Sequence, residues 1–216
     1  FGGEARGEIF QPISKTPMHD WHDANDADWE PVGQWRRAYA FVRSGESVEQ
    51  AVAREVTNTR ENLGLLDAST LGKLVVKGAD AGKFLDMMYT NMMSNLKVGK
   101  CRYGLMCSEN GFLIDDGVVA RIDDDTWLCH TTTGGAETIH GHMEEWLQTE
   151  WWDWDVYVAN VTEQMAQVAV VGPNARKVLE KLGGMDISKE ALPFMEWRDG
   201  QIGGSDCRAY RISFSG

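Results

Sequence analysis

The sequence predicts an α+β fold, because short strands, amphipathic helices and a hairpin alternate along it without a long parallel β-α-β array. Residues 1–35 hold much of the Pro and Trp but few helical stripes, so we expect an irregular, ordered arm there. Residues 36–216 are expected to form the domain that this arm wraps. With 216 residues, 43% of them hydrophobic, the chain is long enough to bury a sizeable core.

Apolar spacing and capping signals place the helices. Ser47 and Gln50 form a capping box before an apolar stripe over residues 48–63, and Gly64 suits the left-handed position after the helix. The same spacing, with Pro at a helix start and Gly at a helix end, predicts further helices near 81–88, 136–147 and 175–182.

Alternating side chains and turn residues place the strands. Residues 101–107 and 112–122 are predicted as a hairpin, since the segment between them contains Asn110-Gly111, the strongest short-range hairpin signal. The last alternating segment either closes a sheet or belongs to a chain that was cut within a domain, and the residues alone leave both open. The other predicted strands are 73–77, 126–131, 155–162, 166–171 and 208–214.

Charge and cysteine usage limit the partners and the compartment. Lys and Arg number 21 against 33 Asp and Glu, a formal net charge of −12, so nucleic acid and anionic membrane surfaces would be repelled. No stretch approaches a membrane-spanning length. The four cysteines show no C-x-x-C spacing and are interpreted as reduced thiols of a cytoplasmic protein.

Several candidate sites are weak. His19 and His22 lie among aspartates, but no further ligand cluster accompanies them, so no metal is predicted. Dinucleotide-binding, P-loop and nucleophile-elbow motifs do not occur in the sequence. The tryptophan run over residues 146–154 could stack on bases, but in an acidic chain it is better interpreted as packing.

The hairpin carries the strongest candidate, because Asp115 and Asp116 interrupt an otherwise apolar strand. Adjacent side chains point to opposite faces of a sheet, so one carboxylate must face the buried side. With a two-residue loop, Tyr103 shares a face with Asp116, directly opposite or one diagonal step away. A three-residue loop would pair Tyr103 with Asp115 instead. The alternative is a purely structural carboxylate that caps a nearby loop.

Short segments in the right order resemble the glycine-cleavage T-protein (aminomethyltransferase) family. The general segments are 66–72, with its Asp-x-Ser pattern, 102–116 and 170–175, with its Gly-Pro turn. Others look most like the C-terminal region of heterotetrameric sarcosine oxidase alpha subunits, namely 16–19, 89–91, 131–134, 143–146 and 211–216.

This resemblance implies an aminomethyltransferase-like domain, incomplete at its C-terminus, that binds tetrahydrofolate. In such oxidases a flavin site oxidises sarcosine to an imine, and the folate site captures the one-carbon unit as 5,10-methylenetetrahydrofolate. NAD, FAD and FMN are implied only for the complete assembly, as are a flavin-carrying beta subunit and other subunits as partners. We expect the chain alone to be inactive as an oxidase.

The resemblance carries the family's folate-contacting carboxylate, the catalytic position, onto Asp116 at the wall of a pteridine-sized hollow. Three positions depart from the T-protein pattern: Thr132 replaces Asn, Phe214 replaces Tyr, and His130 replaces a small apolar residue. Asp115 is included because an odd-numbered hairpin loop would turn it toward the pocket. The folate-binding candidates are therefore Leu71, Tyr103, Asp115, His130, Thr132 and Phe214.

Two further expectations follow from the resemblance. The family continues beyond the segment that matches 213–216 into a glutamate-bearing strand and another domain, so we expect this chain to be a portion of a longer protein. The functional alternatives are a folate-dependent demethylase of another substrate, of dimethylglycine or sulfonium type, and a non-catalytic module that binds a subunit.

Overall fold

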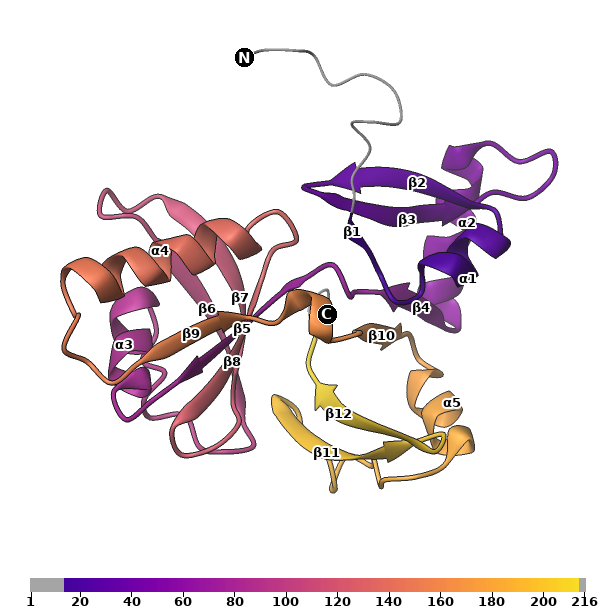
Figure 1. Cartoon of the computed structure of the whole chain (residues 1–216). Coiled ribbons are helices and arrows are strands. Elements are labelled where there is room, and N and C mark those ends of the chain that lie inside the picture. The colour runs from indigo at the N-terminus through magenta and orange to yellow at the C-terminus, as the bar shows by residue number, and fades with distance from the viewer. Residues whose placement is uncertain (1–13, 214–216) are drawn as a thin grey trace, which may run out of the picture. The chain divides into compact units, whose positions relative to one another are not determined.

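The computed structural model describes residues 14–213, which form two compact units. The first comprises residues 14–70 with Glu163–Pro173, and the second comprises Leu71–Thr162 with residues 174–213 (Figure 1). Strands and helices are mixed in both, and the only parallel strand pair within residues 14–213 joins two residues of β1 to β3. The predicted α+β class is therefore confirmed.

The first unit is built on two small sheets. β3 pairs with β1 on one side and with β2 on the other, and β4 pairs antiparallel with β10. Its elements are β1 (Ser14–Lys15), α1 (His19–Ala24), β2 (Ala27–Val32), β3 (Trp35–Phe41), α2 (Val48–Glu61), β4 (Gly64–Asp67) and β10 (Val168–Val171).

Residues 14–35 form regular elements, so the irregular arm predicted over residues 1–35 was wrong there; residues 1–13 lie outside the described part. The predicted boundary at residue 35 also falls inside β3. The sequence did not predict helix α1, because its buried residues are His19 and His22 rather than aliphatic side chains. His22 is held by Asp67, with 3.0 Å between Nε2 and Oδ2, and His19 packs against Trp29.

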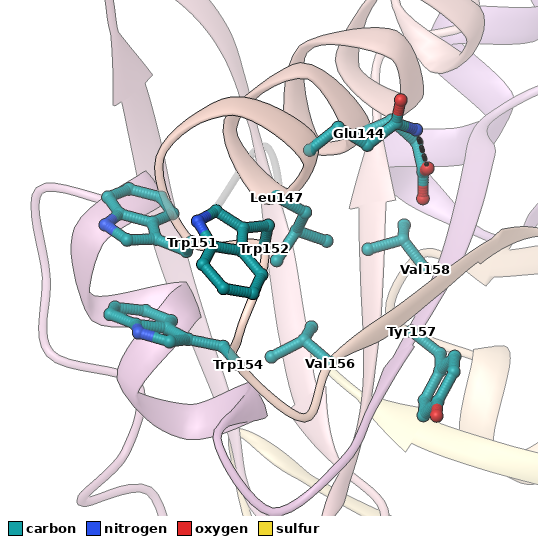
Figure 2. A pocket seen from close by; sticks show the side chains of 9 residues that line it. Glu144, Leu147, Trp151, Trp152, Trp154, Val156, Tyr157 and Val158 are labelled. Carbon is teal, nitrogen blue, oxygen red and sulfur yellow. Dashed lines mark hydrogen bonds between the residues drawn. The ribbon is translucent and has the colours of Figure 1, made fainter.

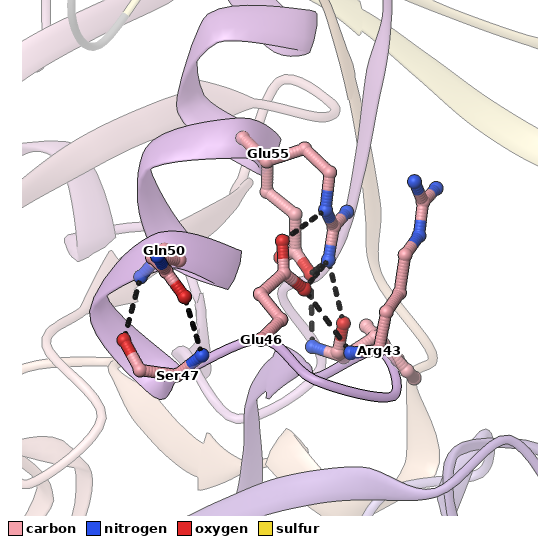
Figure 3. Close-up of polar contacts among 7 residues, drawn as sticks. Arg43, Glu46, Ser47, Gln50 and Glu55 are labelled. Carbon is pink, nitrogen blue, oxygen red and sulfur yellow. Dashed lines mark hydrogen bonds and ion pairs between the residues drawn. The ribbon is translucent and has the colours of Figure 1, made fainter.

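The predicted capping box begins α2 (Figure 3). The backbone N–H of Gln50 donates to the Ser47 hydroxyl. The side-chain oxygen of Gln50 in turn accepts from the backbone N–H of Ser47 at 2.8 Å. Arg54 ties the preceding turn to the helix by donating to both carboxylate oxygens of Glu46. These hydrogen bonds lower the pKa of Glu46 to about 2.

The end of α2 differs from the prediction. The helix ends at Glu61, followed by Asn62, whereas Gly64 opens strand β4. A Cβ at Gly64 would overlap the side chain of Thr59, so the glycine provides close packing of strand on helix rather than a left-handed turn.

The second unit contains a five-stranded antiparallel sheet in the order β6-β7-β8-β5-β9. Every strand and helix of this unit was predicted except β11, some with shifted ends. Its elements are β5 (Gly72–Lys77), α3 (Ala81–Met88), β6 (Cys101–Cys107), β7 (Leu113–Arg121), β8 (Thr126–Thr131), α4 (Ala136–Thr149), β9 (Tyr157–Asn160), α5 (Ala175–Leu182), β11 (Glu196–Ile202) and β12 (Ser205–Arg211).

One face of this sheet packs against α3 and α4 to form the core (Figure 1). Leu74, Met106, Val119 and Cys129 lie on this face, all at most 1% exposed, and meet Phe84 of α3. We call it the core face. The other face carries the candidate site.

The hairpin β11–β12 attaches to the edge of the sheet at β6. The Cys101 amide donates to the Met195 carbonyl at 2.7 Å, and the Trp197 indole donates to the Arg121 carbonyl at 3.0 Å. All four cysteines are free thiols. Within residues 14–213 no helix is both long and apolar enough to cross a bilayer.

Replacing Ser47 with Ala should destabilise the protein by about 1 kcal/mol, because the backbone N–H of Gln50 loses the hydroxyl that accepts its hydrogen bond at the start of α2. Chemical denaturation followed by circular dichroism measures the change. Ser47→Thr is the matched control, since it keeps the capping hydroxyl. Equal stability of the Ala variant and the unmodified protein would contradict this role.

Candidate functional site

The β6–β7 register decides which carboxylate accompanies Tyr103. Tyr103 pairs with Val118 and Leu105 pairs with Asp116, so Tyr103 and Asp116 share a face one diagonal step apart. This confirms one of the two expected pairings and excludes the pairing with Asp115. The irregularity between Met106 and Cys107 absorbs the odd residue near the turn.

Asp115 lies on the core face and is 5% exposed. It pairs with Met106, and its carboxylate accepts hydrogen bonds from the backbone N–H groups of Asp116, at 2.8 Å, and Thr132, at 3.1 Å. A buried carboxylate needs such donors. Asp115 thus anchors the loop after β8 and does not share a face with Asp116, which fits the structural alternative for this one residue.

Asp116 lies on the opposite face, where it is partly buried. The Tyr103 hydroxyl donates a hydrogen bond to Asp116 Oδ2, and this bond raises the pKa of Tyr103 above its usual 10.0. The Tyr103 ring is 45% exposed. The Asp116 carboxylate, whose other oxygen is not bound by Tyr103, and the accessible ring of Tyr103 therefore lie side by side.

The same face continues across β8 and β5, and we call it the Asp116 face. His130 Nδ1 lies 2.9 Å from the Val118 carbonyl. Burial lowers the pKa of His130. The ring of Tyr210, from β12, stands edge-on to His130 with centroids 5.8 Å apart, and burial raises the pKa of Tyr210 to about 12. Lys73, 2% exposed, lies on this face of β5.

The remaining candidates are placed differently. Leu71 contributes its carbonyl, which accepts from Lys73 Nζ at 2.7 Å. Thr132 has an exposed side chain, and its backbone N–H binds Asp115. Phe214 lies outside the described residues.

Sequence reasoning missed Lys73 and Tyr210. The signal for Lys73 was a lysine inside an apolar strand, and the signal for Tyr210 was the alternation of the last strand. Neither pattern reveals that Tyr210 meets His130, 80 residues away in the sequence, because sequence alternation assigns a face and not a neighbour.

A glycine permits the close approach of β7 and β8 at the site. A Cβ at Gly117 would overlap the His130 carbonyl. Only glycine therefore allows β7 to lie this close to β8 beside Asp116. The close approach keeps Asp116 and His130 on one continuous surface.

Two hollows in the described part of the chain lie away from Asp116, and neither is the expected pteridine-sized hollow. One lies along α2, and the other is lined by residues of α4, β9 and their connection (Figure 2). Within residues 14–213, no cluster of three His, Cys, Asp or Glu side chains is arranged to hold a metal ion.

The Asp116 face suits recognition rather than acid–base chemistry. Asp116 can accept hydrogen bonds from N–H groups of a polar ring, and the exposed Tyr103 ring can pack beside that ring. Carboxylate and phenol hold each other in place, which preorganises the pair for a ligand.

Comparison with known proteins identifies the family and the relatives of this chain. Residues 18–216 match the family described as the GCVT N-terminal domain. The chain is 51% identical over 216 residues to the sarcosine oxidase subunit alpha of Corynebacterium sp. (strain P-1) and 42% identical over 217 residues to that of Rhizobium meliloti (strain 1021). Each alignment covers 99% of this chain but 22% of the relative, so the chain spans about a fifth of their length.

A solved structure shows the fold. The glycine cleavage system aminomethyltransferase T from Bartonella henselae superposes with a TM-score of 0.72 at 23% identity, covering 86% of this chain and 47% of that one. The aminomethyltransferase of Alkaliphilus metalliredigens (strain QYMF) is 28% identical over 202 residues, which cover 94% of this chain and 51% of that protein. The predicted aminomethyltransferase-like fold is confirmed.

Replacing Asp116 with Asn should lower the pKa of Tyr103 toward 10.0, because the phenol loses its hydrogen bond to a charged acceptor. NMR titration of tyrosine-labelled protein measures this pKa directly. Asp124→Asn, in an exposed turn, is the control and should leave it unchanged. An unaltered Tyr103 pKa in the Asp116 variant would show that the pair does not persist in solution.

Acidification should destabilise the protein through His130. Burial lowers the pKa of His130 below 6.5, so the unfolded chain binds a proton more readily than the folded protein as pH falls below 6.5, and the free energy of unfolding decreases. His130→Gln should lose less stability than the unmodified protein between pH 7 and about pH 5.

Denaturant unfolding at each pH measures this difference. His140→Gln, on α4, is the matched control, and it should follow the unmodified protein. His19, whose pKa burial also lowers, contributes equally to all three proteins and cancels in the comparison. Parallel pH profiles for His130→Gln and the unmodified protein would refute the assignment.

Proposed function

The chain belongs to the GCVT N-terminal domain family, and from this premise we propose that its Asp116 face binds tetrahydrofolate. The observation that carries the proposal is the Asp116–Tyr103 pair, a carboxylate and a phenol fixed on the sheet face opposite the core. Aminomethyltransferases are among its relatives, which supports a role related to folate.

The chemistry of the residues present fits such a ligand. A pterin offers several ring N–H donors, and Asp116 has one carboxylate oxygen that Tyr103 does not engage. Tyr103 supplies an accessible aromatic surface. Burial lowers the pKa of His130 and thereby favours its neutral form, which does not compete for Asp116 as a cation would.

Lys73, which is buried, and Tyr210 lie next to His130 on this face. Lys73 brings a cation to the same face, and Tyr210 fixes the His130 ring from the β12 side. Leu71, whose carbonyl holds Lys73 Nζ, sets the position of that cation. Thr132 and Phe214 stay proposed contacts from the resemblance, and Asp115 is proposed to act through Thr132, whose N–H it binds.

In the longer protein, we place this face in a sarcosine oxidase. When bound, tetrahydrofolate would supply the nitrogen nucleophile that takes up the one-carbon unit as 5,10-methylenetetrahydrofolate. The protein's task is then to orient the ligand, with little acid–base work. The oxidation itself would occur at flavin sites outside this chain, with NAD, FAD and FMN in the complete assembly and a flavin-carrying beta subunit as partner.

Asp116→Asn in the complete oxidase should suppress 5,10-methylenetetrahydrofolate formation and leave sarcosine oxidation intact. Loss of a charge-assisted hydrogen bond, worth about 1.5–3 kcal/mol, should weaken tetrahydrofolate binding roughly tenfold or more. The products are quantified together with free formaldehyde, which replaces the folate product when the imine is hydrolysed.

Asp124→Asn, from the exposed turn before β8, is the control and should retain folate coupling. Undiminished coupling in the Asp116 variant would reject the assignment of the folate carboxylate. Loss of sarcosine oxidation together with coupling would instead indicate a structural role for Asp116.

A further inference from the structure

A second candidate site lies in the hollow between the end of α4 and strand β9 (Figure 2). Its volume is about 250 Å³, and Glu144, Leu147, Trp152, Val156 and Tyr157 are among its lining residues. This volume is below the range of about 300–1,000 Å³ typical of small-molecule pockets. The hollow is therefore sized for a single side chain rather than for a cofactor.

One wall of the hollow is rigid. Trp151 stacks on Trp146 with centroids 5.3 Å apart and on Trp154 at 4.9 Å. Lys83 Nζ covers Trp154, 3.7 Å from its centroid. Because Trp146, Trp151 and Trp154 also pack against the core, this wall is preformed, and a ligand would not have to order it.

Two aromatic side chains of the hollow remain open. Trp152 is 77% exposed and Tyr157 is 72% exposed. Other tryptophans of this chain carry a guanidinium over the ring: Arg36 over Trp29 at 4.4 Å, Arg121 over Trp127 at 4.9 Å, and Arg208 over Trp197 at 4.2 Å. Trp152 has no such partner among the described residues.

The charge of the region favours a cation. Glu144 lines the hollow, and its carboxylate accepts from the neutral Gln148 side chain at 2.9 Å, with no ion pair to Glu144 among the described residues. The sequence has no Lys or Arg between Arg121 and Arg176. Two cations of other elements lie close by, since Lys83 covers Trp154 and Lys77 is the strand partner of Tyr157. The carboxylate of Glu144 itself forms no ion pair among the described residues, so it would attract a positively charged group.

We propose that this hollow receives an arginine side chain from a protein segment outside this chain. A planar guanidinium can stack on Trp152 or Tyr157 and at the same time donate N–H groups to Glu144. A methylated ammonium could use the aromatic rings but has no donors for the carboxylate. Exposed Trp and Tyr beside a preformed hollow are typical of the anchor points of protein interfaces.

The test uses N-acetyl-arginine methylamide as the probe, titrated into the 216-residue chain while the indole N–H signals are followed by NMR. We expect the Trp152 signal to shift in a saturable way. The neutral citrulline analogue, which has the same shape, should leave it unshifted. Binding should weaken with added salt, because an ion pair contributes.

Variants locate the interaction. Glu144→Gln, followed at the Trp152 signal, and Trp152→Ala, followed at the Trp151 and Trp154 signals, should each weaken binding by about fivefold, the scale of an exposed cation–π contact or ion pair. Glu145→Gln, the next residue of α4, is the matched control for charge, and Trp21→Ala, at another exposed tryptophan, is the control for aromatic surface. Both controls should bind like the unmodified chain.

Three results would overturn the proposal: no saturable shift of Trp152, equal binding of the citrulline analogue, or tighter binding of tetramethylammonium than of the arginine probe. The last would mark the hollow as a site for quaternary ammonium ions instead. Circular dichroism of each variant verifies that the fold is retained, so that lost binding reports on the hollow itself.

Discussion

Alternation of side chains along β7 sends two neighbouring carboxylates to opposite faces of one sheet, and the candidate site depends on which face each takes. Asp115 can be buried because two backbone N–H groups meet its carboxylate. Asp116 is thereby left on the other face with Tyr103. A shift of one residue in the β6–β7 register would exchange the two. The irregularity at Met106 and Cys107 is therefore as important to the site as the carboxylates themselves.

Much of the second unit could be predicted from the sequence, because its elements carry local signals. The Asn110-Gly111 turn predicted the hairpin, and counting from that turn left two registers, one of which places Tyr103 on the same face as Asp116. The strand 126–131 was predicted with the bounds of β8. Family resemblance then selected Asp116 over Asp115. Its proposed contact with folate stays a prediction.

What could not be predicted lacks a local signal. Helix α1 buries histidines, so no apolar stripe marks it. Strand β11 contains Trp-Arg-Asp-Gly-Gln, where the polar run hides the alternation, and β12 pairs with it throughout. The run of tryptophans was interpreted as packing, which is confirmed for Trp146, Trp151 and Trp154 but wrong for Trp152, the most exposed of them. The sequence does not distinguish a tryptophan that stacks in the core from one that faces solvent.

The stretch without Lys or Arg between Arg121 and Arg176 has a consequence for digestion of this protein. Trypsin cleaves after Lys and Arg, so it has no cleavage site from the start of β8 through α4 and β9 to the end of β10. Trypsin therefore releases this region as one long acidic peptide that contains Glu144, Trp152 and Tyr157. Peptide-resolved footprinting of this region therefore needs a protease that cleaves at aromatic or acidic residues.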